Sequence, residues 1–239
     1  SNTALHLTIP TSRRYNLMIF FNFYNNCSKY CLRIMSYLFR YAGMTILVLL
    51  LAQKALCQED CVLKKSNGDL KVYSCPSKDE KLNKIRTEVI LENTTFERFL
   101  EFVWDVENYV TWQYNTVEAT ILKTGRNSMV YRTVVEAPWP LSNREMFTEI
   151  ESRYDSIGKK LQIITRSMNY EYPSDDDLVR VPFSNGVWDV SLLGKSSLKV
   201  VYTLTIDPGG SVPPWLLNMA IAEGPYQSFT NLKEKLSSR

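Results

Sequence analysis

The sequence predicts an α+β fold in which an antiparallel β-sheet is covered by one long C-terminal α-helix. Short β-branched segments recur at even spacing between residues 61 and 207, and helical patterns occur only near the two ends of that region. After the last strand, Val212-Pro213-Pro214-Trp215 opens an amphipathic pattern that continues to about Leu236. A helix of that length spans roughly 33 Å. It needs a broad surface to lie on, and we expect the strands to supply it.

Residues 1–57 differ from the rest of the chain in charge. They hold six basic and no acidic residues, which leaves 22 basic and 25 acidic residues in 58–239. The apolar run from Met44 to Leu51, followed by small residues, is typical of a secretory signal peptide, here cleaved after Cys57. The run is shorter than the ~20 residues of a membrane span. We therefore expect export to a periplasm or the extracellular space; the alternative is a membrane tether formed by this apolar segment.

The chain divides into an N-terminal extension with the signal-like segment, residues 1–57, and one domain, residues 58–239. Within the extension, the aromatic and Asn-rich stretch from Phe20 to Asn26 has neither a helical nor a strand period. We expect residues 1–34 to lie upstream of the true start and outside the fold. The slightly acidic domain argues against nucleic acid as a partner, because nucleic acid requires a basic surface.

Two cysteines, Cys61 and Cys75, remain in the domain, and they flank the turn Ser66-Asn67-Gly68-Asp69. Asn-Gly is a strong hairpin signal, so the two cysteines face each other across two strands. We expect a disulfide in an exported protein, and two buried thiols are the alternative. The domain has no histidine, because the only one is His6, and we expect no metal site and no cofactor.

The remaining elements follow in order along the domain. A strand over 83–92 precedes Asn93-Thr94-Thr95, which matches a glycosylation sequon but is explained more simply as the cap of a helix that begins at Phe96. A shorter helical segment covers 106–112. The strands that follow are expected at 116–123, 128–136, 145–154, 160–168, 178–181, 187–193 and 199–207.

The strand faces indicate what the sheet encloses. On the strand 128–136, Met129, Tyr131, Thr133 and Val135 share one face. A solid core is usually filled with Leu, Ile and Phe, whereas small hydroxylated residues leave space and offer hydrogen bonds, as a ligand cavity does. The alternative is that threonine simply favours strands. Alternation alone leaves both interpretations open.

The chain resembles the START (StAR-related lipid-transfer) family from about Asp60 to Leu236. The resemblance rests on a set of residues in a fixed order: Asn67-Gly68, Val72-Tyr73, Trp112, Tyr131, Pro138-Trp139-Pro140, Asn143-Arg144-Glu145, Gly186-Val187-Trp188, Asp207-Pro208-Gly209-Gly210, Pro214-Trp215-Leu216 and Asn218. Family members usually have Arg-Asp where this chain has Arg144-Glu145. The resemblance implies a helix-grip fold, in which a curved antiparallel sheet wraps around the long C-terminal helix and a tunnel between them shields one hydrophobic ligand.

The resemblance also implies a function and a site. Family members bind a lipid or a similar amphiphile and are not usually enzymes, so we expect lipid binding and transport by a monomer with transient membrane contact. Sterol-binding members carry an acidic and a basic residue at positions that align with Tyr131 and Ile150, which are uncharged. Arg144, Trp188, Asp207, Gly209 and Gly210 are expected to be structural. The expected cavity residues are Met129, Tyr131, Thr133, Val135, Thr148, Ile150, Thr165, Met219, Ala222, Tyr226 and Phe229.

Two other functions remain open. Without histidine in the domain, Ser-His-Asp and Cys-His catalysis are excluded, but a cyclase-like or hydrolase-like enzyme could use carboxylate or tyrosine acid–base chemistry. Glu223, Glu171 and Tyr131 are the candidates for that role. The third reading is a partner-binding envelope protein with a filled interior. A continuous apolar void of several hundred Å³ favours a lipid carrier over such a scaffold.

Overall fold

The computed structural model describes residues 61–173, 175 and 177–237, without the side chains of Pro214, Trp215, Asn218 and Met219. The chain forms two units, Ser1–Gln58 and Glu59–Arg239. The signal-like segment and the upstream extension, both predicted within residues 1–57, lie outside the described residues. No helix in the described part is long and apolar enough to span a membrane.

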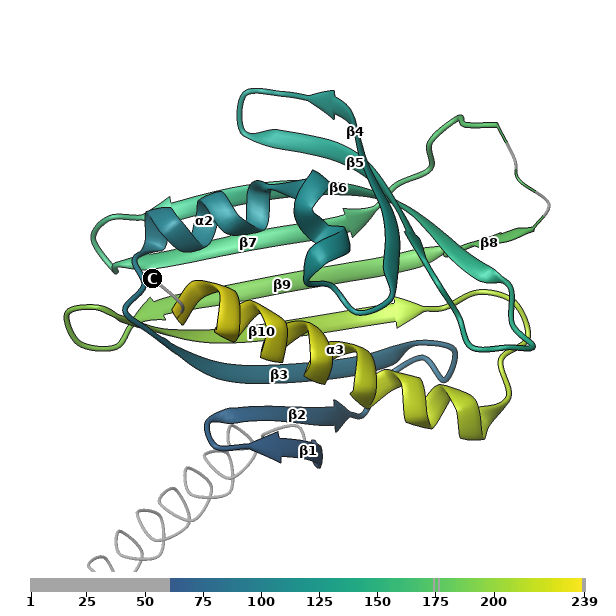
Figure 1. The fold of residues 1–239 in the computed structure, drawn as a ribbon, viewed down its shortest axis with the longest axis horizontal. Coiled ribbons are helices and arrows are strands. Elements are labelled where there is room, and N and C mark those ends of the chain that lie inside the picture. Colours follow the sequence, from purple (N-terminus) through teal and green to yellow (C-terminus); the bar gives the residue numbers. More distant parts are fainter. Residues whose placement is uncertain (1–60, 174, 176, 238–239) are drawn as a thin grey trace, which may run out of the picture. The chain divides into compact units, whose positions relative to one another are not determined.

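One ten-stranded sheet forms the body of the second unit, as the sequence predicts (Figure 1). The strands pair in the order β1-β2-β3-β10-β9-β7-β6-β5-β4, every neighbouring pair is antiparallel, and β8 adds to β6 in parallel. Their bounds are β1 Val62–Asn67, β2 Leu70–Cys75, β3 Asn83–Glu92, β4 Thr116–Thr124, β5 Ser128–Val135, β6 Asn143–Asp155, β7 Lys160–Ser167, β8 Leu178–Arg180, β9 Phe183–Leu192 and β10 Ser197–Asp207.

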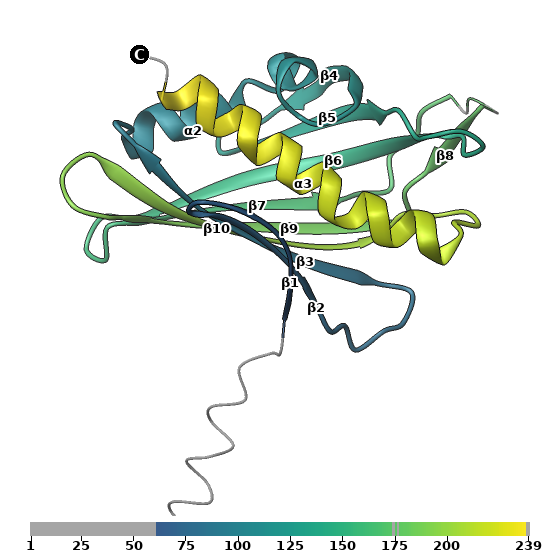
Figure 2. The ribbon, with the colours of Figure 1, turned by 60° about the horizontal axis from the view of Figure 1, so that its bottom comes forward.

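Three helical segments accompany the sheet: α2 (Phe96–Trp104), the 3-10 helix η1 (Val106–Thr111) and α3 (Pro214–Ser237). The sheet curves around α3, which runs across its concave face, as the helix-grip prediction requires (Figures 1 and 2). Thr95 caps α2 as predicted, because its side chain accepts a hydrogen bond from the Arg98 backbone N–H at 3.3 Å. The alternation of β3, with four buried residues on one face, provides a surface for the helix.

Strand β9 begins four residues earlier than the sequence predicts. The prediction began this strand at Val187, but β9 starts at Phe183 and contains Ser184, Asn185 and Gly186. In the structure Gly186 pairs with Thr165 on one side and Leu204 on the other. A Cβ at Gly186 would clash with Thr165 Oγ1 and lie 2.9 Å from the Tyr202 hydroxyl. Residue 186 is therefore glycine because its neighbours inside the sheet leave no space for a side chain, and it does not mark a turn.

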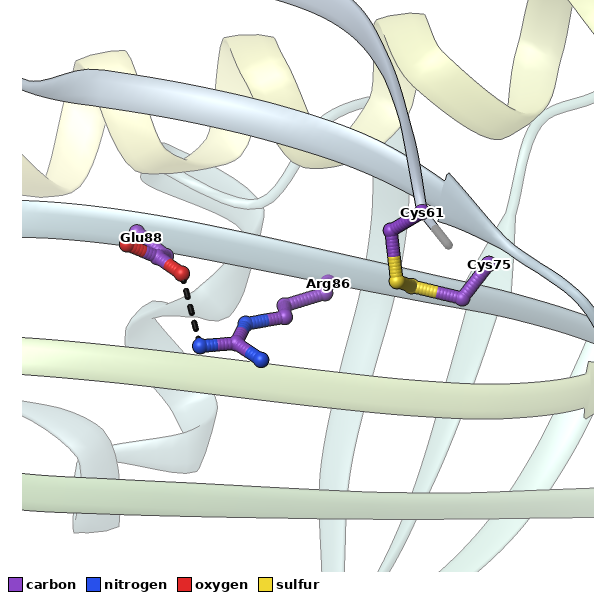
Figure 3. The surroundings of a disulfide bond; sticks show 4 residues. All are labelled: Cys61, Cys75, Arg86 and Glu88. Carbon is purple, nitrogen blue, oxygen red and sulfur yellow. Dashed lines mark ion pairs between the residues drawn. A yellow bond between two sulfur atoms is a disulfide. The ribbon is translucent and has the colours of Figure 1, made fainter. Parts of the chain in front are cut away.

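Cys61 and Cys75 form a disulfide that ties the start of β1 to the end of β2 (Figure 3). The bond lies beside the ion pair between Arg86 and Glu88, which are 2.7 Å apart on β3. Because β1 is at the edge of the sheet, it has a strand on only one side. The disulfide therefore adds a covalent link where the hydrogen-bonded ladder is least supported.

Candidate functional site: a cavity beneath α3

A cavity of about 590 Å³ lies between α3 and the concave face of the sheet. Its sheet side is lined by residues of β3, β4, β5, β6, β7, β9 and β10, and its helix side by residues of α3 between Leu216 and Phe229. Among the lining residues, Tyr114, Glu136 and Pro138 are exposed, so the cavity opens to solvent beside them. A cavity of this size and apolar character is typical of small-molecule sites.

The rest of the space beneath α3 is filled. Phe99, Ile163, Val190, Leu198 and Leu232 are fully or almost fully buried in one core cluster. At the hollow end, four inward positions on neighbouring strands are occupied by small hydroxylated residues: Thr133, Thr148, Thr165 and Ser184. Small side chains at these positions leave a volume that larger residues would occupy, and this difference in side-chain size creates the cavity.

The strand residues that were predicted to line the cavity fall into two groups in the structure. Tyr131, Thr133, Val135, Thr148 and Thr165 line the cavity. Met129 and Ile150 do not line it, because they are buried next to each other on β5 and β6 within the core cluster. The inward face continues from the hollow end into the filled end, and alternation alone cannot show where the hollow part stops.

The predicted face of α3 differs from the observed one. Phe229 lines the cavity as predicted, but Ala222 and Tyr226 do not, and the Met219 side chain is outside the described residues. Tyr226 instead lies beneath the ammonium group of Lys65 on β1, 5.0 Å from the ring centroid. The helix is rotated about its axis relative to the prediction. Apolar residues occur around much of its circumference, so the sequence pattern fitted more than one inward face. The residues that face the cavity are Leu216, Leu217, Ala220, Ile221, Glu223, Gly224, Pro225, Ser228 and Phe229.

Three tyrosines on separate elements converge within the cavity: Tyr109 of η1, Tyr131 of β5 and Tyr202 of β10. The rings of Tyr109 and Tyr131 meet edge to face with centroids 5.5 Å apart. Burial raises the pKa of all three hydroxyls, that of Tyr131 to about 12. They are therefore neutral hydrogen-bonding groups at physiological pH. Sequence reasoning missed Tyr109 and Tyr202, although strand alternation places Tyr202 on the same face as Leu204.

The ionisable residues on the cavity wall include Glu136, Arg144 and Glu223. Glu223 pairs with Lys65 and also accepts a hydrogen bond from Gln227 at 2.8 Å. The hydrogen bond from Lys65, followed by that from Gln227, lowers the pKa of Glu223. A carboxylate with a lowered pKa is a poor general acid. Glu171 is exposed and does not line the cavity, so the three predicted acid–base candidates do not converge.

Arg144, which is expected to be structural, contacts backbone carbonyl groups. Its guanidinium donates hydrogen bonds to the carbonyl of Ser142 and, at 3.5 Å, to that of Gly209, which joins the β5–β6 loop to the turn before α3. In that turn, the Gly209 N–H donates to Asp207 Oδ1 at 2.9 Å, and Gly209 has a positive φ of 67°. The left-handed backbone suits glycine, and the contacts hold the turn in place.

The ion pairs in this region involve Glu145 instead. This carboxylate is 3% exposed and accepts hydrogen bonds from Arg132 at 2.7 Å and from Arg180 at 3.0 Å. The pairs connect β5, β6 and β8. Trp188, predicted to be structural, packs against Phe229 with ring centroids 5.2 Å apart and also borders the cavity. Among the residues that the structure describes, no three His, Cys, Asp or Glu side chains cluster to hold a metal ion.

Comparison with known proteins gives the following relatives. An uncharacterized protein of Pseudomonas aeruginosa is 26% identical over 184 residues, which cover 76% of this chain and 89% of that protein. Human START domain-containing protein 10 is 28% identical over 142 residues, which cover 59% of this chain but only 48% of that protein. Rat phosphatidylcholine transfer protein is 24% identical over 178 residues, covering 73% of this chain and 82% of that protein. No family model matches the chain.

Among solved structures, a STAR-related lipid transfer protein from Xanthomonas axonopodis superposes with a TM-score of 0.66 at 23% sequence identity. The match covers 74% of this chain and 98% of the other. At this level of identity the similarity establishes the shared fold.

Proposed function

We propose that this chain, which is homologous to START domain proteins and has their helix-grip fold, binds one lipid or similar amphiphile and transports it in the cavity beneath α3. The observation that carries the proposal is the cavity itself. It has about 590 Å³ of space, mostly apolar walls and a few hydroxyl groups inside. Such a site removes an apolar chain from water and leaves polar groups to orient it.

The cavity geometry does not favour the enzyme alternative. Glu223 is held by Lys65, Glu171 lies outside the cavity and Tyr131 is neutral, so the acid–base set proposed from the sequence is not assembled. A filled interior, which a scaffold protein would have, does not agree with the observed void.

Three further features belong to this proposal. We infer export, supported by the Cys61–Cys75 disulfide, because disulfides persist in oxidising compartments. Transient membrane contact is supported by Trp139, which is 91% exposed and adjoins Pro138 at the mouth of the cavity. Tryptophan is suited to the membrane–water interface. The protein acts as a monomer in this proposal, since one chain encloses the whole cavity.

Lipid extraction from the purified full chain, followed by mass spectrometry, tests the proposal. We expect one lipid per chain. Leu217→Trp, which places a bulky side chain in the cavity wall, should reduce the bound lipid severalfold. Leu193→Trp is the matched control, because Leu193 lies in the exposed β9–β10 turn, away from the cavity. Equal loading of both variants, or no binding of any lipid, would contradict the proposal.

A further inference from the structure

Arg144 is a half-buried, positively charged residue on the wall of the cavity. Arg144, Met146 and Thr148 alternate along β6 and all line the cavity, so they form one inward row. The guanidinium of Arg144 reaches the turn before α3, where it donates a hydrogen bond to the Gly209 carbonyl. Pro208, in the same turn, also lines the cavity. The charged group therefore lies between β6 and the turn that leads into α3.

Arg144 forms no ion pair with any residue that the structure describes. Its neighbour Glu145 is on the opposite face of β6, where Arg132 and Arg180 bind its carboxylate at 2.7 and 3.0 Å. Burial lowers the pKa of Arg144, and no carboxylate in the described part of the chain offsets this effect. Because arginine is not deprotonated in proteins, the guanidinium is a partly desolvated cation without a counter-ion.

The guanidinium also has hydrogen-bonding capacity left for a ligand. Its contacts with the carbonyls of Ser142 and Gly209 use two of the five N–H groups of arginine, which leaves three. The guanidinium is planar, and its paired N–H groups match two oxygens of a carboxylate or a phosphate. The two carbonyl contacts fix the group in place, so little side-chain freedom is lost when an anion binds.

The two carboxylates on the cavity wall do not neutralise this cation. Glu223 is paired with Lys65 on β1. Glu136 is exposed at the mouth of the cavity, where water solvates it. A charge that is partly removed from water costs free energy unless a group of opposite charge compensates it. A carboxylate or phosphate on the ligand supplies that compensation, whereas an uncharged head group does not.

The rest of the cavity suits the apolar part of such a lipid. Leu216, Leu217 and Ile221 of α3 line the cavity, and Phe229 lines it farther along the same helix. These side chains provide the apolar surface that an alkyl chain requires. A lipid can therefore place its head group at Arg144 and its chain along α3.

We propose that Arg144 binds the anionic head group of the lipid, a carboxylate or a phosphate, beside the turn before α3. This inference rests on the proposed lipid-binding function and adds the residue and the chemistry that recognise the head group. Arg144 then has two roles, because the same guanidinium holds the turn through carbonyl groups and binds the ligand through its remaining N–H groups.

A competition experiment on the full chain tests the head-group chemistry. The protein is incubated at neutral pH with equimolar hexadecanoic acid, hexadecyl phosphate, hexadecanol and methyl hexadecanoate in mixed micelles. The bound compounds are quantified by mass spectrometry after extraction. The alkyl chains have the same length, so we expect the two anions to predominate through their head groups. Predominance of the alcohol or the ester would overturn the anionic head group and leave the carrier function intact, whereas absence of all four compounds would overturn both.

A second arm separates a lipid head group from a free anion. Inorganic phosphate in excess should leave the amount of bound hexadecyl phosphate unchanged, because the alkyl chain contributes most of the binding free energy. Displacement by inorganic phosphate would assign Arg144 to a free anion and overturn the recognition of a lipid head group.

Variants of Arg144 test the residue itself. Arg144→Gln removes the charge but keeps N–H donors for the carbonyl contacts, and it should lower the ratio of bound hexadecanoic acid to hexadecanol roughly tenfold. Arg144→Lys keeps the charge and should retain much of the ratio. Hexadecanol binding should persist in both variants, which shows that the cavity is still formed.

Arg153→Gln is the matched control on the same strand, because the Arg153 side chain is 67% exposed and outside the cavity. Its ratio of bound acid to alcohol should equal that of the wild-type protein. An unchanged ratio in Arg144→Gln would overturn the proposal. Loss of hexadecanol binding in both Arg144 variants would also overturn it, because Arg144 would then serve only the structure of the cavity.

Discussion

The two halves of α3 perform different tasks although they belong to one helix. In the C-terminal half, Phe229, Leu232 and Leu236 are almost completely buried and belong to the core cluster. In the N-terminal half, Leu217 and Ile221 are half-buried and face the cavity. The comparison shows that one helix can hold the fold together at one end and cover a ligand site at the other. What differs is the size of the side chains opposite it on the sheet.

The β1–β2 hairpin lies alongside this helix and holds it with two ion pairs. Lys65 pairs with Glu223 near the middle of α3, and Lys233 pairs with Asp69 at 2.9 Å near its end. Lys233 follows Glu223 by ten positions, which correspond to about 15 Å of helix. Both contacts are in the middle and C-terminal part, so the residues before Glu223 are without this support.

Truncation of one leucine in each half should show the largest difference. Leu232→Ala removes a fully buried side chain from the filled half and should lower the free energy of unfolding by about 2–5 kcal/mol. Leu217→Ala should lower it by only about 1 kcal/mol, because that side chain already borders open space. Urea denaturation of both variants measures the two values, and equal losses would contradict the comparison.

Removal of the disulfide should weaken the hairpin that supports the filled half. The bond closes a loop with a sequence separation of 14 residues. Replacement of Cys61 and Cys75 by serine should therefore lower the free energy of unfolding by about 3 kcal/mol, mainly because the unfolded chain gains freedom. The control is a reducing agent, which should destabilise the wild-type protein but not the double variant. A wild-type protein that is indifferent to reductant would show that the bond does not form.

Filling the hollow half should stabilise the fold and impair binding. Thr133→Ile places an extra apolar group in the cavity on a strand that favours β-branched residues. We expect a gain of about 0.5–2 kcal/mol in the free energy of unfolding, together with less bound lipid. Thermal denaturation and lipid extraction measure the two effects. A loss of stability with unchanged loading would mean that the wall at Thr133 is already tightly packed.

The smallest expected effect is the loss of stability at low pH. Hydrogen bonds from Lys65 and Lys233 lower the pKa values of Glu223 and Asp69 below their ordinary values of 4.5 and 3.8. Carboxylates with lowered folded-state pKa values stabilise the protein above their unfolded values, and this contribution is lost as the pH falls through the folded values. Each partly exposed pair contributes about 0.2–1 kcal/mol. Stability measured between pH 6 and 3 should therefore fall less steeply in Glu223→Gln; an identical slope would contradict the pairing.

Much of the fold could be predicted from local patterns. The Asn67-Gly68 turn and its flanking cysteines, the Thr95 cap and the alternation of the strands are short-range features, and the structure has them. The strand Phe183–Leu192 was recognised only in part, because the reason for Gly186 is the close approach of Thr165 and Tyr202, which are distant in sequence. The role of Glu145 was missed for the same reason, since its two arginine partners come from other strands.

The sequence by itself determined that a long helix lies on an antiparallel sheet with small hydroxylated residues on its inner face. Periodicity and turn chemistry are properties of neighbouring residues, so they can be read along the chain. Only the tertiary structure decided which turns of α3 face the void, that Met129 and Ile150 belong to the core, and that Tyr109, Tyr131 and Tyr202 meet at the cavity. These features depend on the rotation of one element against another, which the packing of all the side chains sets together.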